Sequence, residues 1–437
     1  MADPKSFRVI IAGGGIAGLV LANALEKAGV DFILLEKHDI APQIGASIII
    51  QCHTGKVFDQ LGVWEQMCAA TFPLTGRLHF DEHSRLFEDS PIFKLVREKT
   101  GIPILLMERR FCLDTLYNNI KDKSRLHTNV AVTSFLEDED GINVITNRGE
   151  NIKGSILVAA DGVHSTIRTL LADSNTIDTK RRENLIGAFT SNYRTLFGIS
   201  TNWLGNDTTR PLFPAGVVHH VYYRNVSGIT AAGAKGYVFW FLFIKEDESS
   251  RMPNCPRYTD ADAVDTIERY GHLSAKPGYT FRDLWDTKIK AGMTNMEEGV
   301  VKGPWNNGGR VVLIGDAICK TTVNSGFGGN LAVEGVCTLV NELLSLLEIT
   351  QIPTANDIVS VFERYERIQR PRAEISVAIS NRTTRYESID SLWLRLQLWL
   401  SPWIPQSHKV RSFLSYMAPA PIFNFLPGPN NPQAAGG

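Results

Sequence analysis

The chain has 437 residues, of which 43% are hydrophobic and 21% charged, and its formal net charge is −1. This composition is that of a globular protein with a full core, and the near-neutral charge argues against nucleic acid as a partner. Six cysteines without a CxxC pair exclude a disulfide framework and a metal site of the zinc-finger type. The N-terminus lacks the pattern of a secretory signal, so we expect a cytoplasmic protein.

The segment Phe7–Glu36 predicts a dinucleotide-binding unit. A β-branched run is followed by the glycine pattern Gly13, Gly15, Gly18, a helical stretch and a second buried strand that ends at Glu36. Glycines allow backbone N–H groups at a helix N-terminus to approach a pyrophosphate, and an acid about 20 residues further on can bind a ribose diol. Both NAD and FAD carry this ADP moiety, so the unit alone does not distinguish them.

Two later strand ends carry ligand-type loops. ILVAADGVHSTIR, at Ile156–Arg168, ends a buried strand at Asp161, and the run RVVLI leads into GDAICKTTVNSGFGGNLAVEGV with Asp316 at its start. Ligands of open α/β sheets gather at the carboxyl ends of strands. Three such ends in one chain indicate one long cofactor that crosses the sheet edge.

These motifs, together with ERRFCLDTLY and YERIQRPRA, resemble the group A FAD-dependent monooxygenases of the para-hydroxybenzoate hydroxylase type. Within that family the chain is similar to the fungal branch that epoxidises or hydroxylates terpenoid, meroterpenoid and indole-diterpenoid intermediates. The resemblance implies an α/β fold, in which a Rossmann-type FAD-binding domain is interleaved with a β-sheet substrate domain and followed by C-terminal helices. It also implies FAD as cofactor, NADPH or NADH as electron donor and O2 as co-substrate.

The resemblance assigns cofactor contacts residue by residue. The expected cofactor-binding residues are Gly13, Gly15, Ala17, Gly18, Glu36, Gly45, Ala46, Arg109, Asp161, Asp316, Gly328, Gly329 and Asn330. Simpler interpretations stand beside these assignments: Asp161 and Asp316 could cap the helices that follow them, and Arg109 could lie on the surface with Arg110 in its place. The chain departs from the family pattern at Cys319, where His is usual, and at Val323, where Pro is usual.

The middle of the chain predicts the substrate domain, over residues 184–285. Its β-rich runs are typical of an antiparallel sheet with one apolar face, on which we expect Phe197, Trp240 and Phe243 to meet a bulky lipophilic substrate. Arg194 is the charged residue within these apolar neighbours. It either points to solvent or points into the pocket as a catalytic cation, and we choose the catalytic role. The pair His219-His220 is interpreted as structural.

The remaining boundaries follow from the same motifs. We expect the FAD-binding domain at residues 1–183 and again at 286–350, and a helical region with a disordered tail at 351–437. The stretch Leu392–Ile404, LWLRLQLWLSPWI, has no clean polar face. The resemblance favours helices here. This stretch, with three tryptophans close together, either packs on the catalytic domains, which we favour, or contacts a membrane interface.

The sequence thus predicts an FAD-dependent monooxygenase that inserts oxygen into a lipophilic terpenoid-derived natural-product intermediate, with NAD(P)H and O2. One alternative is a flavoenzyme that dehydrogenates, isomerises or cyclises the same class of substrate without oxygenation. A second alternative is a flavin-bound partner protein without catalysis. We expect Val323, in place of the usual proline, to weaken the protection of the activated oxygen, so that part of it leaks as H2O2.

Overall fold

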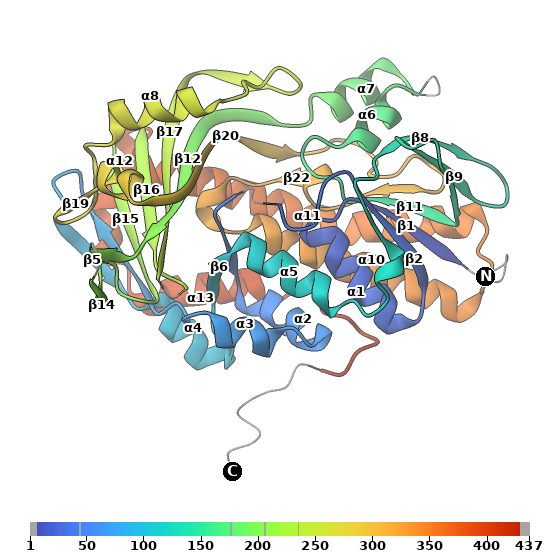
Figure 1. Ribbon diagram of the computed structural model, residues 1–437, viewed down its shortest axis with the longest axis horizontal. Helices are drawn as coiled ribbons and strands as arrows, with labels where there is room; N and C mark the ends of the chain where they lie inside the picture. The colour runs from blue at the N-terminus through green and yellow to red at the C-terminus, as the bar shows by residue number, and fades with distance from the viewer. Residues whose placement is uncertain (1–6, 43–44, 175–176, 205–206, 235, 429–437) are drawn as a thin grey trace, which may run out of the picture.

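The computed structural model describes residues 7–42, 45–174, 177–204, 207–234 and 236–428 (Figure 1). Its centre is a five-stranded parallel sheet in the order β21 (Val311–Leu313), β11 (Ile156–Ala159), β1 (Arg8–Ala12), β2 (Asp31–Glu36), β7 (Leu126–Thr128). Strands β1, β11 and β21 are short and buried almost throughout, as expected for a parallel sheet that is covered on both faces. The predicted strand–turn–helix–strand unit is confirmed, with α1 at Ile16–Ala28.

Helices cover one face of the parallel sheet, and a smaller sheet covers the other (Figure 1). The helical layer is formed by α1, α5 (Arg109–Asn119), α10 (Gly328–Ile349) and α11 (Ala355–Glu387). The covering sheet has the order β10 (Asn151–Gly154), β9 (Ile142–Thr146), β8 (Val132–Glu137). This layered arrangement buries α1 almost completely, which explains why its sequence is apolar on nearly every face.

A second sheet of eight strands forms the other half of the molecule. Its order is β22 (Cys319–Lys320), β20 (Lys288–Val300), β12 (Thr190–Thr201), β17 (Tyr237–Arg251), β16 (Val226–Ala231), β15 (Val217–Tyr223), β4 (Gly76–Phe80), β5 (Leu86–Ser90). All of its neighbouring strands are antiparallel except β15 and β4. The sheet therefore takes strands from both sides of residues 184–285. The predicted division at those boundaries needs this correction, because β4, β5, β20 and β22 lie outside them.

The remaining elements connect these layers. They are β3 (Ser47–Ile50), β6 (Leu105–Glu108), β13 (Trp203–Leu204), β14 (Asp207–Pro211), β18 (Ser274–Lys276), β19 (Tyr279–Thr280), α2 (Cys52–Leu61), α3 (Trp64–Ala70), α4 (Ile92–Thr100), α6 (Thr166–Ala172), α7 (Thr179–Ile186), α8 (Asp260–Tyr270), α9 (Phe281–Asp286) and the 3-10 turns η1 (Lys123–Arg125), η2 (Gly315–Ala317), η3 (Val323–Ser325) and η4 (Ser401–Trp403). Two further helices, α12 (Leu392–Leu400) and α13 (Gln406–Met417), follow α11.

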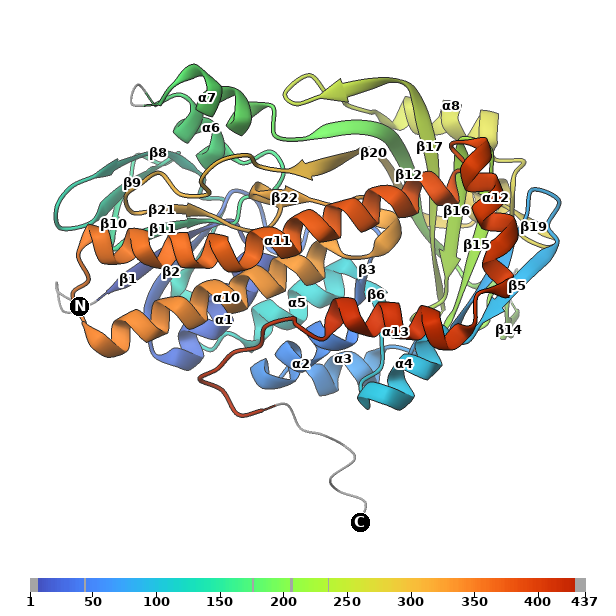
Figure 2. The same cartoon turned by 180° about the vertical axis from the view of Figure 1, so that it is seen from behind.

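The long helix α11 spans both halves of the molecule (Figure 2). It packs along α10 and continues to β20 and β15 of the eight-stranded sheet. A capping box begins it: the Thr354 hydroxyl accepts from the Asp357 amide, and the Asp357 carboxylate accepts from the Thr354 amide. One rigid element thus reaches from the parallel sheet to the eight-stranded sheet.

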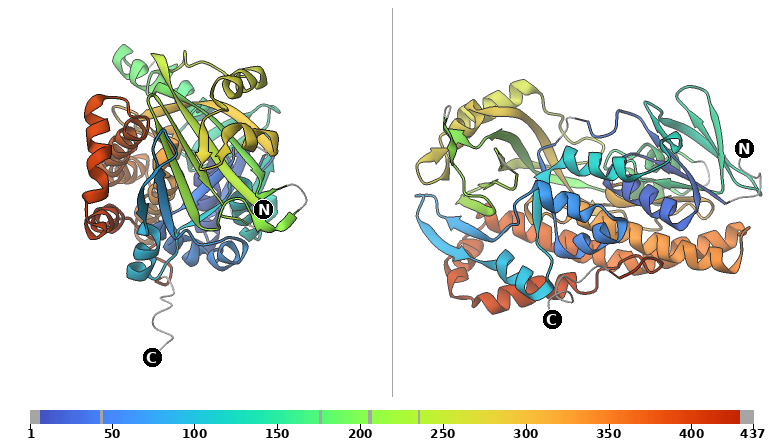
Figure 3. Two further views of the ribbon diagram at one scale, coloured as in Figure 1. Left: turned by 90° about the vertical axis from the view of Figure 1, so that its left-hand side faces the viewer. Right: turned by 60° about the horizontal axis from the view of Figure 1, so that its bottom comes forward.

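The C-terminal helices lie against the edge of the eight-stranded sheet, coloured red in Figure 3. The tryptophan side chains of this stretch do not take part in that packing, because Trp393, Trp399 and Trp403 are 63–67% exposed. Contact with a membrane interface stays a prediction. Across the described ranges, no helix is long and apolar enough to cross a membrane. The predicted disordered tail lies largely outside the described residues.

Candidate active site

Four predicted ligand positions fan out along one edge of the parallel sheet. The strand order β21, β11, β1, β2 places Asp316, Asp161, Gly13 and Glu36 at or just beyond successive carboxyl ends. Parallel strands end at the same edge, so motifs that are far apart in sequence become neighbours. This edge can accommodate one elongated ligand.

The glycine turn after β1 is shaped for close approach. A Cβ on Gly13, whose φ is +110°, would lie 2.5 Å from the Ala160 carbonyl oxygen, and one on Gly18 would lie 1.9 Å from the Gly13 carbonyl oxygen. A Cβ on Gly15 would meet nothing within 4 Å. Helix α1 begins next to this open space without a side-chain cap, so its first amides are free to bind an anion.

Glu36 fixes this turn. Its Oε2 accepts from the Gly14 amide at 2.6 Å, and its Oε1 accepts from the His38 amide at 2.9 Å. An ionised carboxylate offers about four acceptor positions, so two remain for a diol. The geometry is therefore compatible with the expected ribose contact.

Asp161 is partly a capping residue and partly unpaired. Its Oδ2 accepts from the Ile167 amide at 3.0 Å, whereas its Oδ1 is buried without a hydrogen-bond partner in the described structure. Burial raises the pKa of Asp161 against the opposing hydrogen bonds from Ser165 and Ile167. An unpaired buried carboxylate oxygen is costly, and a ligand hydroxyl at this position would satisfy it.

Asp316 pairs with a lysine and does not cap the following helix, which was the alternative interpretation. Its carboxylate lies 2.5 Å from the Lys320 ammonium, and the 3-10 turn η2 that contains it has no side-chain cap. Burial alone would lower the pKa of Lys320, but the Asp316 carboxylate outweighs this effect and the pKa is raised. Sequence reasoning missed Lys320, although its spacing of four residues from Asp316 was a signal. Both side chains line a cavity that opens at this sheet edge.

The start of α10 presents a second set of free amides. Gly328 and Gly329 are its first residues, they line the cavity, and no side chain caps them. The Asn330 side chain is instead used within the protein: its Oδ1 accepts from the Gln51 amide, and its Nδ2 donates to the Ile49 and Gly326 carbonyls. Asn330 is thus a positioning residue that ties α10 to β3.

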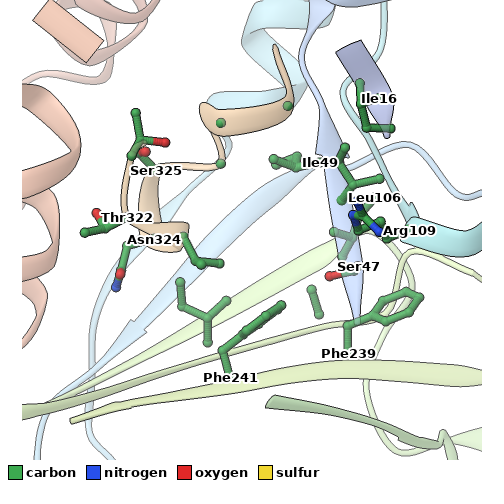
Figure 4. A pocket seen from close by; sticks show the side chains of 18 of the residues that line it. Ile16, Ser47, Ile49, Leu106, Arg109, Phe239, Phe241, Thr322, Asn324 and Ser325 are labelled. Carbon is green, nitrogen blue, oxygen red and sulfur yellow. The ribbon is translucent and has the colours of Figure 1, made fainter. Parts of the chain in front are cut away.

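Arg109, not Arg110, faces the cavity (Figure 4). The Arg109 amide donates to the Ala46 carbonyl at 3.1 Å, which holds the start of α5 against the Gly45-Ala46 loop. Arg110 forms an exposed pair with Asp114 at 3.6 Å. Of the two arginines only Arg109 lines the cavity, so its cofactor contact stays a prediction while Arg110 lies at the surface.

The cavity extends from the sheet edge over the eight-stranded sheet (Figure 4). Of the predicted cofactor residues, those that line it are Gly15, Ala17, Arg109, Asp316, Gly328 and Gly329. The others lie outside this lining: Gly13, Gly18, Glu36, Gly45, Ala46, Asp161 and Asn330. Its far wall is apolar, with Phe239, Phe241 and Phe243 from alternate positions of β17.

Strand alternation corrects two expectations. Arg194 pairs across the sheet with Ile244, whereas the next residue, Thr195, pairs with the cavity-lining Phe243. Arg194 therefore lies on the face away from the cavity, where its Nη1 donates to Glu246 at 2.5 Å. The expectation that this cation points into the pocket is wrong. Trp240 also lies on the face away from the cavity, because its position on β17 alternates with those of the cavity-lining phenylalanines.

The loop with the unusual residues is firmly held. Val323 is 41% exposed and lines the cavity, whereas Cys319 is buried, with its sulfur 3.9 Å from the Ala373 carbonyl oxygen. The neighbouring Thr322 hydroxyl lies 2.7 Å from the Ser380 hydroxyl, and Asn324 Nδ2 donates to Glu387 at 2.6 Å. Side chains of α11 thus compensate in part for the conformational freedom of Val323.

Comparisons with known proteins agree with this geometry. Residues 6–194 match the family described as FAD binding domain. The FAD-dependent monooxygenase janM of Penicillium janthinellum is 33% identical over 89% of this chain and 79% of its own length. The FAD-dependent monooxygenase ausM of Aspergillus calidoustus is 32% identical over 99% of this chain and 91% of its own length.

The fold also matches a solved structure, HpxO of Klebsiella pneumoniae complexed with FAD and uric acid. The TM-score is 0.74 at 19% identity, with 95% of this chain and 97% of that chain covered. The free amides of α1 and α10, the open space at Gly15 and the unpaired oxygen of Asp161 fit a dinucleotide along the sheet edge. Fold and site therefore define an FAD-binding oxidoreductase. The chain belongs to the FAD-dependent monooxygenases, and the fold class and family predicted from its sequence are confirmed.

Proposed function

We propose that FAD lies along the edge formed by Asp316, Asp161, Gly13 and Glu36, with its pyrophosphate at the start of α1. Bound there, the cofactor would supply the reducing equivalents and the oxygen activation of a monooxygenase. The amides of Gly328 and Gly329 would face the flavin ring system, where backbone donors stabilise negative charge. The unpaired Asp161 oxygen and the open space at Gly15 support this placement.

The protein itself would bind, orient and exclude water. Apolar side chains of β17 and β16 form a wall against which a lipophilic molecule can pack, and residues 322–326 close the opposite side. Excluding water from this space strengthens each electrostatic contact and protects reactive species. Lys320 would hold the Asp316 carboxylate in place beside the cofactor, because the two groups lie within ion-pair distance.

The substrate that suits this cavity is a lipophilic, terpenoid-derived natural-product intermediate, which would be epoxidised or hydroxylated. The apolar wall of Phe239, Phe241 and Phe243 is the observation that carries this proposal. NADPH or NADH would be the electron donor, as the family resemblance implies.

Incubation of the FAD-loaded enzyme with candidate terpenoid phenols, NADPH or NADH, and O2 tests the proposal by product mass. A gain of one oxygen atom is the expected result. An unchanged mass in a new product would instead support isomerisation or cyclisation, and a loss of two hydrogens would support dehydrogenation. If neither NADPH nor NADH reduces the flavin in the presence of any candidate substrate, the proposed electron donors are contradicted.

A further inference from the structure

The side of the cavity that the eight-stranded sheet forms, its floor, includes the apolar β17 wall. This floor changes from apolar to polar across the sheet. One row of cross-strand neighbours runs through Phe241, Ile229 and His220, and the next runs through Phe239, Ala231, Val218 and Arg77. All seven side chains line the cavity. The β17 and β16 end of each row is apolar, whereas the β15 and β4 end carries nitrogen donors. A ligand on this floor would meet two chemically different ends.

Arg77 is a cation without an ion-pair partner in the described parts of the chain. Its Nε is buried and makes no hydrogen bond, and its guanidinium lies 4.7 Å from the centre of the Phe93 ring. Burial lowers the pKa of Arg77, against the carboxylates of Glu387 and Glu88 and the Tyr222 phenol. A half-buried cation whose Nε has no hydrogen-bond partner costs free energy, which a bound anion would recover.

His220 presents a second unpaired nitrogen to the same end. The residue is 4% exposed, its Nδ1 lies 3.1 Å from Glu387 Oε1, and its Nε2 is buried without a hydrogen-bond partner in the described structure. The other oxygen of Glu387 accepts from Asn324 Nδ2 at 2.6 Å. Glu387 thus lies within ion-pair distance of the imidazole, although neither ring nitrogen makes a hydrogen bond within the described residues. In its doubly protonated form the ring would direct Nδ1–H toward Glu387 and offer Nε2–H to a ligand anion.

The two residues are neighbours in the sheet. Arg77 is registered with Val218, and His220 is two positions further along β15, so both side chains belong to one face. The His79 ring stacks on the His220 ring at 5.0 Å, and His79 Nδ1 is 2.7 Å from the Tyr222 hydroxyl. These contacts hold His220 in place from the side.

We propose that Arg77 and His220 bind a negatively charged oxygen group of the substrate. The substrate would then be an amphiphilic organic acid, with its apolar body on the β17 phenylalanines and a carboxylate, enolate or phenolate at the β15 and β4 end. The inference rests on the proposed function because it assigns the substrate to the same cavity. A nearly symmetrical hydrocarbon would leave both donors unpaired, so the site selects against it.

Binding of matched probes to the FAD-loaded full chain tests this assignment through the change in flavin absorbance. The probes are 4-hexylbenzoate, its neutral isostere 4-hexylbenzamide, and 4-hexylphenol, which separates a carboxylate from a phenol. We expect the benzoate to bind about tenfold or more tightly than the benzamide, because a charge-assisted pair exceeds a neutral hydrogen bond. Equal affinities for the two isosteres in the unmodified protein would overturn the proposal. Tightest binding of the phenol, with the ultraviolet absorbance of its phenolate form, would keep the anchor and assign a phenolate in place of a carboxylate.

Substitutions at single residues test which side chains cause the preference for the benzoate over the benzamide. Arg77→Met should abolish the preference for the benzoate, His220→Phe should reduce it, and Arg77→Lys should retain a part. Arg85→Met is the matched control, because Arg85 lies exposed near the same strands and pairs with Asp81. A full preference in Arg77→Met would overturn the proposal. The assay needs no nicotinamide and no O2, so its failure is distinct from failure of the proposed reaction.

Discussion

At the scale of single residues, carboxylates and cations of similar appearance in the sequence have different environments in the fold. Asp316 lines the cavity and pairs with Lys320, whereas Asp114 pairs with Arg110 at the surface with the same spacing of four residues. Arg194 and Arg77 both lie in strands among apolar neighbours. Only Arg77 lines the cavity, because the two residues lie on opposite faces of one sheet.

Asp316→Asn should weaken FAD binding. The change removes a charge-assisted acceptor, which is worth about 1.5–3 kcal/mol, or roughly 10- to 150-fold in Kd. Fluorescence titration of the apoprotein with FAD measures the effect. Asp114→Asn is the control, since it breaks an exposed pair far from the cavity, and its Kd should not change. An Asp316→Asn protein with the affinity of the unmodified chain would remove Asp316 from the cofactor site.

Arg194→Ala should lower stability more than turnover. The sequence predicted a loss of turnover, but the side chain lies behind the sheet, and its removal leaves the half-buried Glu246 without its cation. We expect about 1–3 kcal/mol less free energy of unfolding, with FAD bound and most of kcat retained. Thermal unfolding and steady-state kinetics on Arg194→Ala and Arg194→Lys separate the two roles. A stable Arg194→Ala protein that has lost its turnover would restore the catalytic interpretation.

At the scale of elements, local patterns predicted strands and helices well but not their faces. The first unit was predictable because β-branched runs, glycines and helical periodicity all agree over Phe7–Glu36. The face of the sheet on which each β12 side chain lies was not predictable, because a bulge between Ser191 and Tyr193 shifts the register of β12 against β17. The polar end of the cavity needs β4 beside β15, a parallel pairing of segments about 140 residues apart that no local signal reports.

Val323→Pro should reduce uncoupled formation of H2O2. Thr322 has an extended backbone, with φ −65° and ψ 156°, which suits a residue before proline, and Val323 is the first residue of η3. The ring should therefore fit, stabilise the protein by about 0.4–1 kcal/mol and stiffen the loop. The ratio of H2O2 to product per NADPH consumed is the measurement. Val323→Ala controls for loss of the side chain, and an unchanged ratio in both variants would contradict the role of this loop.

At the scale of the whole molecule, the C-terminal region shows the limit of composition as a guide. Three tryptophans in thirteen residues suggested packing of this stretch, yet the side chains of Trp393 and Trp399 in α12 and of Trp403 in η4 are mostly exposed. Family membership, fold class and the cofactor edge were predictable from motifs in order. The set of strands that forms the eight-stranded sheet was not predictable, since the strands come from three separate parts of the chain.

Trp399→Ser and Trp403→Ser should change the free energy of unfolding by less than about 0.5 kcal/mol each, because substitutions at exposed positions seldom do more. Denaturant unfolding measures this, and Trp240→Phe, in the buried core, is the comparison that should cost more. A loss of several kcal/mol at Trp399 would show that the cluster is covered in solution. Co-sedimentation with phosphatidylcholine vesicles, unchanged in both Ser variants, would count against the predicted membrane contact.

Helix α11 has one further consequence. Ser380 and Thr384 hold the loop 322–325 beside the proposed flavin position, and Glu387 holds His220 at the polar end of the cavity. Seven residues of helix separate Ser380 from Glu387, which corresponds to about 10 Å along the axis. One helix thus contacts both the loop beside the proposed flavin position and the polar end of the cavity, and it fixes the distance between them. We expect regioselectivity to be set by this fixed length, so that the carbon oxidised is chosen by its distance from the acidic group.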